Sequence, residues 1–277
     1  DVYKRQGLAP DSVIDVGGVT GRTLPRPAGA LLCRIATVND VHFGEREAGR
    51  IDDLEEGPIR RAPDGAEPYP ETMNRAAADE MAAIDPVAVF VKGDLSLDGT
   101  DDEWEAFERC YREPFGERLH VVRGNHDSYR HQDAYAGDSW VELPGVAVAL
   151  LDTAIPGATT GRIRRDQLDW LESRVADSDL PVLVMGHHQQ WVGAPGGNRS
   201  DDYFGLQPDS SDALDESFSR HGNLVAYAAG HTHRHRVRRM AVSGRPTIEV
   251  GCTKDFPGTW AEYRVFEGGI LQVVHRM

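Results

Sequence analysis

Hydrophobic residues gather in six short runs along this chain, at residues 31–38, 87–91, 119–123, 146–151, 181–185 and 224–229. Each run has the length of a strand and is mostly apolar rather than alternating, which is typical of strands covered on both faces. Helical patterns lie between several of the runs, at residues 69–84, 100–115, 164–178 and 210–222. Two of these helices begin with candidate N-caps, Thr100 and Ser210–Ser211. Alternating strands and helices predict an α/β fold with a substantial sheet.

Beyond residue 236 the pattern changes to strand–turn–strand, with Ser243-Gly244 and Gly268-Gly269 as tight-turn signals. This tail is expected to join a sheet, so residues 7–277 are predicted to form one domain. Asp1–Gln6 lack an initiator Met and look like translated adapter sequence, so we expect them to be a non-native leader.

Polar residues follow five of the six apolar runs at the point where each run ends. The endings are Asp40 with His42, Asp94, Asn125 with His126 and Asp127, His187 with His188, and His231 with His233. The run at 146–151 is the exception, because Asp152 follows it without a histidine. Ligands in open α/β sheets gather at the carboxyl ends of strands, so we expect these endings to converge.

The chemistry of the endings indicates a metal site. Carboxylate and amide oxygens mixed with imidazole nitrogens suit Mn, Fe or Zn. Seven ligands are too many for one open catalytic ion and about right for two ions that share a carboxylate. They are Asp40, His42, Asp94, Asn125, His187, His231 and His233. Glycine precedes four endings, at 93, 124, 186 and 230, where its missing Cβ permits tight turns and close backbone approach.

Three histidines alternate in residues 230–239, and the pattern assigns them different roles. On an extended chain, residues two apart point to the same side, so His231 and His233 are expected to face the ions together. His235 has no vacancy among the seven ligand positions and is expected to lie behind the ligands or on the surface.

Composition narrows the class of protein. The net charge of −15 argues against binding of a nucleic-acid polymer, which depends on clustered Lys and Arg. Three widely spaced cysteines argue against a disulfide framework and fit a reducing compartment, so we expect a cytoplasmic protein. No apolar run approaches the roughly 20 residues that span a bilayer, and no membrane contact is expected.

The series of endings resembles the calcineurin-like metallophosphoesterase superfamily, most closely its bacterial cyclic-nucleotide and glycerophosphodiester phosphodiesterase branch. Here the series reads Asp40-Val-His42, Gly93-Asp94, Gly124-Asn125-His126-Asp127, Gly186-His187 and Gly230-His231-Thr232-His233. The resemblance covers roughly residues 31–235. It implies an α/β (α+β) fold of four layers, an αββα β-sandwich flanked by helices, with a dinuclear site at the strand ends.

The same resemblance implies how the ligands divide. One divalent or trivalent ion would be held by Asp40, His42 and His233, and a second by Asn125, His187 and His231, with Asp94 bridging both. Two such ions lower the pKa of a bridging water, so hydroxide can attack the phosphoryl group without a protein nucleophile. We hypothesise that His126 assists the leaving oxygen, an effect of about 10²–10⁴-fold, and that Asp127 orients His126.

The substrate is expected to be a small phosphodiester, with a cyclic nucleotide as one option. Candidate substrate contacts are Asn125, His126, His188 and Arg199. The long polar loops 44–70 and 189–209 follow His42 and His187 directly, so we expect them to form the mouth of the site. Their candidate contacts are Trp191, Tyr203 and Phe204 for stacking and Asn198 with Arg199 for phosphate, while Lys254 or Trp260 would close a further side. Simple loop packing is the alternative for each.

Other functions are weaker. A phosphomonoesterase is the main alternative, but the chain reads "GDLSLDG" and "GNHD" where the protein phosphatases of the superfamily resemble "GDxxDRG" and "GNHE". The acidic charge counts against a nuclease, and the complete ligand set counts against an inactive scaffold. A homodimer is left open.

Overall fold

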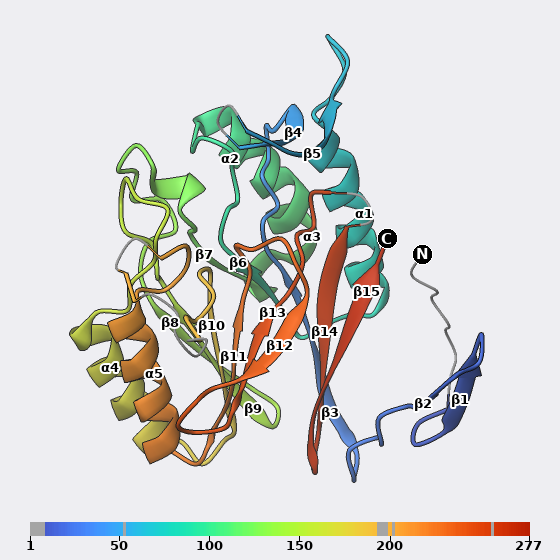
Figure 1. Ribbon diagram of the computed structural model, residues 1–277, viewed down its shortest axis with the longest axis vertical. Helices are drawn as coiled ribbons and strands as arrows, with labels where there is room; N and C mark the ends of the chain where they lie inside the picture. The colour runs from blue at the N-terminus through green and yellow to red at the C-terminus, as the bar shows by residue number, and fades with distance from the viewer. Residues whose placement is uncertain (1–8, 52–53, 193–198, 201–202, 256–257) are drawn as a thin grey trace.

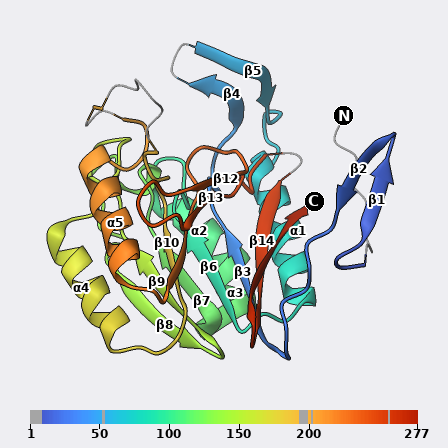
Figure 2. The ribbon, with the colours of Figure 1, turned by 60° about the horizontal axis from the view of Figure 1, so that its bottom comes forward.

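The computed structural model describes residues 9–277, except residues 52–53, 193–198, 201–202 and 256–257. Two sheets pack face to face, with helices on both outer faces (Figures 1 and 2). This is the four-layer αββα arrangement that the resemblance implied. Asp1–Gln6 lie outside the described residues, so the prediction about a leader stays a prediction.

The first sheet has the strand order β12-β13-β11-β10-β9-β8 among the described residues. Its central strands β9 (Val146–Leu151), β10 (Val182–Gly186), β11 (Leu224–Ala229) and β13 (Pro246–Glu249) run parallel. The edge strands β8 (Ser139–Leu143) and β12 (Arg236–Arg239) pair antiparallel with their neighbours.

The second sheet has the order β15-β14-β3-β6-β7 in the same described part of the chain. Strands β3 (Leu31–Val38), β6 (Ala88–Lys92) and β7 (Leu119–Val122) are parallel. Strand β14 (Thr259–Phe266) pairs antiparallel with both β3 and β15 (Gly269–Arg276). All six predicted apolar runs are therefore strands. The predicted tail does join a sheet, but it divides between both: β12 and β13 extend the first, β14 and β15 the second.

The helices cover the sheets as the apolar patterns require. Helices α4 (Arg165–Ala176) and α5 (Pro208–Arg220) lie on the first sheet, where Leu171 and Phe218 pack against it. Helices α1 (Tyr69–Ala83), α2 (Asp101–Phe107) and α3 (Glu113–Phe115) lie on the second, with a π-helical turn at Glu108–Arg112 between α2 and α3. Short 3-10 turns occur at Gly116–Arg118 and His126–Ser128.

The two predicted N-caps have different outcomes. Thr100 caps α2, and its backbone N–H donates to Glu103 Oε2 at 3.1 Å. The prediction at Ser210–Ser211 is wrong, because α5 begins at Pro208, whose fixed φ suits the first helical position. The Ser210 hydroxyl instead accepts a hydrogen bond from the Ile163 backbone N–H at 3.1 Å.

Two hairpins lie outside the sandwich. Strands β1 (Val13–Val16) and β2 (Val19–Arg22) stand beside it near the start of β3 (Figure 1). Strands β4 (Glu47–Ile51) and β5 (Leu54–Arg61) form part of the predicted loop 44–70. No helix in the described parts of the chain is long and apolar enough to cross a bilayer.

Candidate metal centre

The seven predicted ligands converge at one end of the sandwich, where the parallel strands of both sheets end. Asp40 and His42 follow β3, Asp94 follows β6 and Asn125 follows β7, while His187 follows β10 and His231 and His233 follow β11. The side chain of His233 is 35% exposed, whereas the other six residues are buried. Burial of so many charged and polar groups requires that they bind one another or a cation.

The first ligand group contains Asp40, His42 and His233, which the structure brings together as one cluster. His233 Nε2 lies 3.5 Å from Asp40 Oδ1. The rings of His42 and His233 are perpendicular, with centroids 5.4 Å apart. Two atoms that each lie about 2.1 Å from one ion stand roughly 3–3.5 Å apart. The distance of 3.5 Å between His233 Nε2 and Asp40 Oδ1 therefore fits a shared cation.

The second group surrounds His187. The Lys92 carbonyl accepts a hydrogen bond from His187 Nδ1 at 2.9 Å, which fixes the tautomer and turns Nε2 toward the cluster. His187 Nε2 then meets Asn125 Oδ1 at 2.9 Å and His231 Nδ1 at 3.2 Å. Three electron-pair donors facing one another need a proton or a metal ion between them.

Asp94 lies between the two groups. Its Oδ2 is 3.4 Å from His42 Nε2 and 3.2 Å from His187 Nε2. Its Oδ1 accepts a hydrogen bond from the His126 backbone N–H at 3.0 Å, which holds the carboxylate in this position. Asp94 therefore has the placement that a bridging ligand requires.

The backbone is strained at five of the seven predicted ligands. Positive φ angles occur at Asp40 (50°), His42 (43°), Asp94 (53°), His231 (68°) and His233 (52°). Such angles cost of order 1–3 kcal/mol per residue and gather at functional sites. For His231 and His233 they replace the extended geometry that the alternation predicted. The chain bends over residues 231–234, so His231 contacts His187 while His233 contacts Asp40 and His42.

Glycine is needed where two strand endings meet. A Cβ at Gly124 would lie 2.2 Å from Asp94 Oδ1 and 2.4 Å from the Asp94 backbone nitrogen, and a Cβ at Gly93 would lie 2.5 Å from His187 Nδ1. These contacts are too short for any side chain, which confirms the expected close backbone approach at both positions.

The electrostatics of the site favour a positive charge. Burial alone would raise the pKa of Asp40, but the charges of His233 and His187 hold that pKa below its usual range. Burial lowers the pKa of His42, but hydrogen bonds and charge from Asp94 and Glu45 overcome it and raise that pKa to about 10. Asp94 likewise raises the pKa of His187 to about 9. Burial and the charge of His187 lower the pKa of His231 to about 3. Metal binding would displace the protons held here, since an imidazole binds metal only when neutral.

His126 lies beside the cluster, but the prediction that Asp127 orients it is wrong. Its ring centroid is 4.5 Å from that of His42, and its Nδ1 donates to the Leu97 carbonyl at 2.8 Å. The Asp127 carboxylate instead accepts hydrogen bonds from backbone N–H groups of Leu95, Ser96 and Gly124 at 2.8–3.1 Å. Asp127 is buried and satisfied by these donors, so it fixes the loops that carry Asp94 and Asn125 rather than orienting His126.

Two further residues lie beside the predicted ligands. His188 differs from its predicted role, and Tyr129 had no predicted role. His188 is fully buried, with Nδ1 2.8 Å from Thr153 Oγ1 and its ring packed on those of His187 and His231. It forms a potential metal-binding group with His187 and His231, and its Nε2 is buried without a hydrogen-bond partner among the described residues. Tyr129 was not predicted. Its hydroxyl accepts a hydrogen bond from Asn125 Nδ2 at 2.6 Å, which turns Asn125 Oδ1 toward His187.

Of the residues predicted at the mouth of the site, some lie beside the predicted ligands and others are ion-paired or buried in the protein. Phe204 is 46% exposed and lies against His231, with ring centroids 4.1 Å apart. Arg199 pairs with Asp209 and Asp212 and stacks over Trp191, so the free positive charge expected for a phosphate contact is neutralised. Trp260 is a core residue whose indole donates to Glu80, and Lys254 is buried against Glu45. Asn198 lies outside the described residues.

Comparisons with known proteins agree with this geometry. Residues 33–235 match the family model of the calcineurin-like phosphoesterases. A probable cyclic nucleotide phosphodiesterase of Synechococcus sp. is 30% identical over 59% of this chain and 65% of its own length. The 3′,5′-cyclic adenosine monophosphate phosphodiesterase of Pseudomonas aeruginosa is 30% identical over 68% of this chain and 69% of its own length. The chain thus spans about two thirds of the length of these relatives.

Solved structures share the fold. A dimetal phosphatase from Danio rerio superposes with a TM-score of 0.65 at 16% identity, covering 89% of this chain and 96% of that one. A purple acid phosphatase from yellow lupin seeds gives a TM-score of 0.62 at 13% identity, covering 93% and 53%. The match of the family model, which covers well over half of the chain and every predicted ligand, carries the assignment. This chain belongs to the calcineurin-like phosphoesterase family.

Proposed function

We propose that this protein hydrolyses a small phosphodiester with the help of two bound metal ions. The observation that carries the proposal is the position of Asp94, whose Oδ2 lies within 3.4 Å of an imidazole from each ligand group. Asp40, His42 and His233 would hold one ion with Asp94, and Asn125, His187 and His231 would hold the other. The buried, mixed oxygen and imidazole donors suit Mn, Fe or Zn. When bound, two such ions bind phosphoryl oxygens and supply a hydroxide nucleophile near neutral pH.

His126 is the residue we assign to the leaving oxygen. The Leu97 carbonyl can only accept a hydrogen bond, so His126 Nδ1 carries a proton and Nε2 remains for the substrate. Since Nδ1 already carries one proton, Nε2 would donate to the leaving oxygen only from the imidazolium form of His126. Burial lowers the pKa of His126 and disfavours that form, so its assistance should be greatest at acidic pH. The Leu97 carbonyl takes the orienting role first expected of Asp127.

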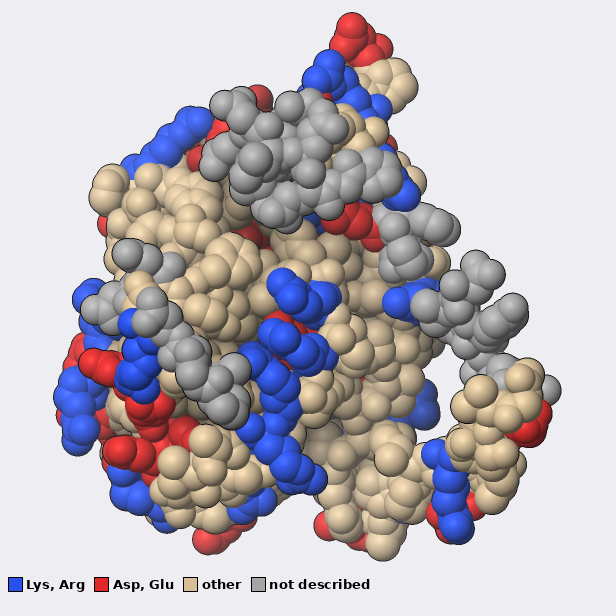
Figure 3. Space-filling view, viewed as in Figure 1, with Lys and Arg blue, Asp and Glu red and all other residues tan. Residues whose placement is uncertain are grey.

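Residues beside the predicted ligands favour a planar, anionic substrate. The exposed ring of Phe204 lies against His231, where it could stack on a base or another planar leaving group. Lys and Arg form a stripe over β12 and β13 (Figure 3). Arg236 and Arg238 are paired with the buried carboxylate of Glu249, and Arg239 lies at the far end of β12. Arg234 is exposed and directly follows His233, so its positive charge would attract an anionic substrate to an otherwise acidic protein. The names of the two relatives favour a cyclic nucleotide. A cytoplasmic location and a homodimer stay predictions.

The test compares substrates on metal-reconstituted protein. We expect bis(p-nitrophenyl) phosphate and a cyclic nucleotide, 2′,3′- or 3′,5′-linked, to be hydrolysed with higher kcat/KM than p-nitrophenyl phosphate. A clear preference for the monoester would replace this proposal with a phosphomonoesterase. Metal-loaded protein without any hydrolysis would indicate a scaffold.

A further inference from the structure

Glu45 is a buried carboxylate that no sequence motif singled out. It lies three residues after His42, and its backbone N–H donates to the His42 carbonyl at 3.2 Å, which closes a tight turn. Gly44 in that turn has a φ of 89°, a conformation that suits glycine. The turn returns the Glu45 side chain to the ring of His42. Glu45 Oε2 and His42 Nδ1 lie 3.2 Å apart, within ion-pair distance, and neither atom makes a hydrogen bond of ordinary geometry to any described residue, including the other of the pair.

Lys254 holds Glu45 from the opposite side. Its Nζ donates to Glu45 Oε1 at 2.8 Å and lies 3.3 Å from the Tyr69 hydroxyl and 3.2 Å from Asp255 Oδ1. Lys254 and Glu45 are only 4% and 7% exposed. The backbone N–H groups of Thr253 and Lys254 point to the carbonyls of Asn39 and Asp40, at 3.1 and 3.4 Å. The loop that carries Lys254 is thereby fastened to the segment that carries the first ligands.

The two ligand groups differ in what lies behind their histidines. His187 Nδ1 donates to a backbone carbonyl, which is neutral. His42 Nδ1 faces a carboxylate that a buried ammonium group fixes in place. A carboxylate behind a metal-binding histidine orients the ring and makes it a stronger ligand, and removal of such a partner typically lowers metal affinity 10–100-fold.

We propose that Glu45, fixed by Lys254, is a positioning residue that makes the ion held by Asp40, His42 and His233 the more tightly bound of the two. The inference rests on the two-ion site proposed above. With an ion bound, His42 Nδ1–H would donate to Glu45 Oε2, which lies 3.2 Å away, and His42 Nε2 would be left for the ion. Glu45 itself touches neither ion nor substrate.

The experiment titrates metal-free full-length protein with Co²⁺ and follows the visible absorption of the bound ion. Wild-type protein is expected to bind two Co²⁺ in two distinguishable steps. Glu45→Gln keeps the shape of the side chain but removes its charge, so the tighter step should weaken 10–100-fold while the other step keeps its affinity. Glu262→Gln is the matched control, because Glu262 is also buried and ion-paired but contacts Arg34, Arg264 and His275 rather than a ligand. It should bind Co²⁺ as the wild type does.

A double variant separates positioning from a purely structural role. Glu45→Gln leaves the Lys254 ammonium buried without its main partner and should destabilise the fold, whereas Glu45→Gln with Lys254→Met removes both charges and should recover stability. Co²⁺ affinity should stay low in the double variant. Recovery of affinity together with stability would overturn the proposal, as would unchanged Co²⁺ affinities in Glu45→Gln. Wild-type protein that binds no Co²⁺ would contradict the proposed function itself.

Discussion

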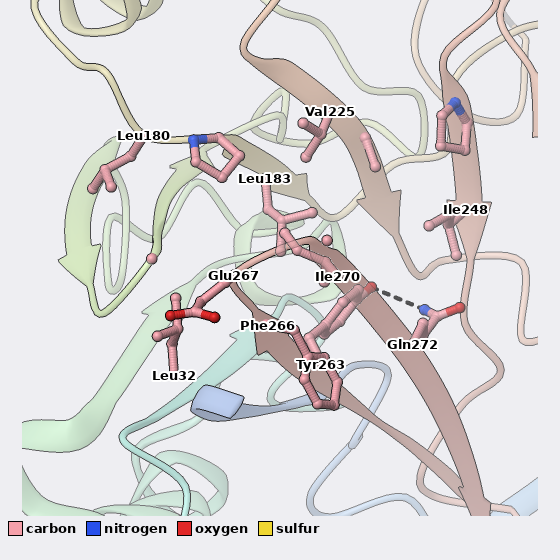
Figure 4. A pocket seen from close by; sticks show the side chains of 15 residues that line it. Leu32, Leu180, Leu183, Val225, Ile248, Tyr263, Phe266, Glu267, Ile270 and Gln272 are labelled. Atoms are coloured by element: carbon pink, nitrogen blue, oxygen red, sulfur yellow. Dashed lines mark hydrogen bonds between the residues drawn. The ribbon is translucent and has the colours of Figure 1, made fainter. Parts of the chain in front are cut away.

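The same strands form both ends of the sandwich, but one end buries polar and charged side chains and the other is lined by apolar ones. At the carboxyl ends, buried carboxylates and imidazoles face one another on a backbone with positive φ. At the other end, the two sheets border a pocket of about 470 Å³ that opens to solvent (Figure 4). Leu183, Val225 and Ile248 line it from the first sheet, and Phe266 and Ile270 line it from the hairpin of β14 and β15. Its polar side chains are paired, since Gln272 donates to the Tyr263 hydroxyl and Glu267 accepts from the Ala30 backbone N–H.

The contrast shows a division between function and stability. Strain and buried charge lower the stability of the end that carries the predicted ligands, here called the metal end, and such strain is typical of functional sites. The opposite end is lined mostly by apolar side chains around a pocket, and the burial of these side chains stabilises the fold. Substitutions at the metal end should therefore change catalysis more than folding, and substitutions at the apolar end should do the reverse.

The largest effect is expected from Asp94→Asn. Loss of the carboxylate between the two groups removes several kcal/mol of transition-state stabilisation, so kcat should fall on the order of 10³-fold. The metal-free variant should unfold at a lower temperature than the wild type, because the protonated imidazoles of His42 and His187 lose their buried counter-charge, so kcat is compared at a temperature where both proteins are folded. Wild-type kcat in a variant that binds two ions would contradict the bridging role.

Leu183→Ala tests the apolar end. Leu183 is 2% exposed and borders the pocket, so its truncation should enlarge the pocket and lower the free energy of unfolding by about 2–3 kcal/mol. Urea denaturation measures the loss, and kcat and KM measured on folded protein should be unchanged. A parallel loss of kcat would show that the two ends are coupled.

Phe204→Ala should have a smaller effect, on substrate affinity. If the exposed ring stacks on a planar leaving group, its loss removes about 1 kcal/mol, which corresponds to a rise in KM of roughly fivefold. Steady-state kinetics with a cyclic nucleotide measure the change, and Phe204→Tyr is the control that keeps the stacking surface. Equal KM values for the alanine variant and the wild type would show that Phe204 does not contact the substrate.

The smallest effect concerns Glu262, which lies in β14 between the two ends. Burial raises its pKa, but hydrogen bonds from His275 and Arg264 outweigh burial and lower that pKa from 4.5 to about 2. A lowered folded-state pKa means that the ionised carboxylate stabilises the fold above pH 4.5 and that this contribution disappears as pH falls toward 2. The difference in unfolding free energy between wild type and Glu262→Gln, measured without metal, should shrink over that interval. A difference that is independent of pH would contradict the assigned cause.

Local patterns were enough for the main elements of the fold. The six apolar runs form strands because each has the length of a strand and is apolar on both faces. Thr100 caps a helix through a local motif. Strand β8 was missed because Ser139–Leu143 is only half buried and pairs at an edge. The π-helical turn at Glu108–Arg112 interrupts what reads in the sequence as one continuous helix.

The same limit applies to the site. The sequence by itself determined which polar residues gather at one edge of the sandwich, because each directly follows a strand, and parallel strands end at a common edge. It did not determine the contacts of those residues. Asp127 was assigned to its neighbour His126, yet it binds backbone N–H groups of Leu95 and Ser96, more than 30 residues away in the chain. Glu45 and Lys254, which are 209 residues apart, meet only because the tail returns to β3. Tertiary structure decided these contacts, since hydrogen bonds and ion pairs depend on distances of a few ångströms that strand order and register create and that local sequence does not encode.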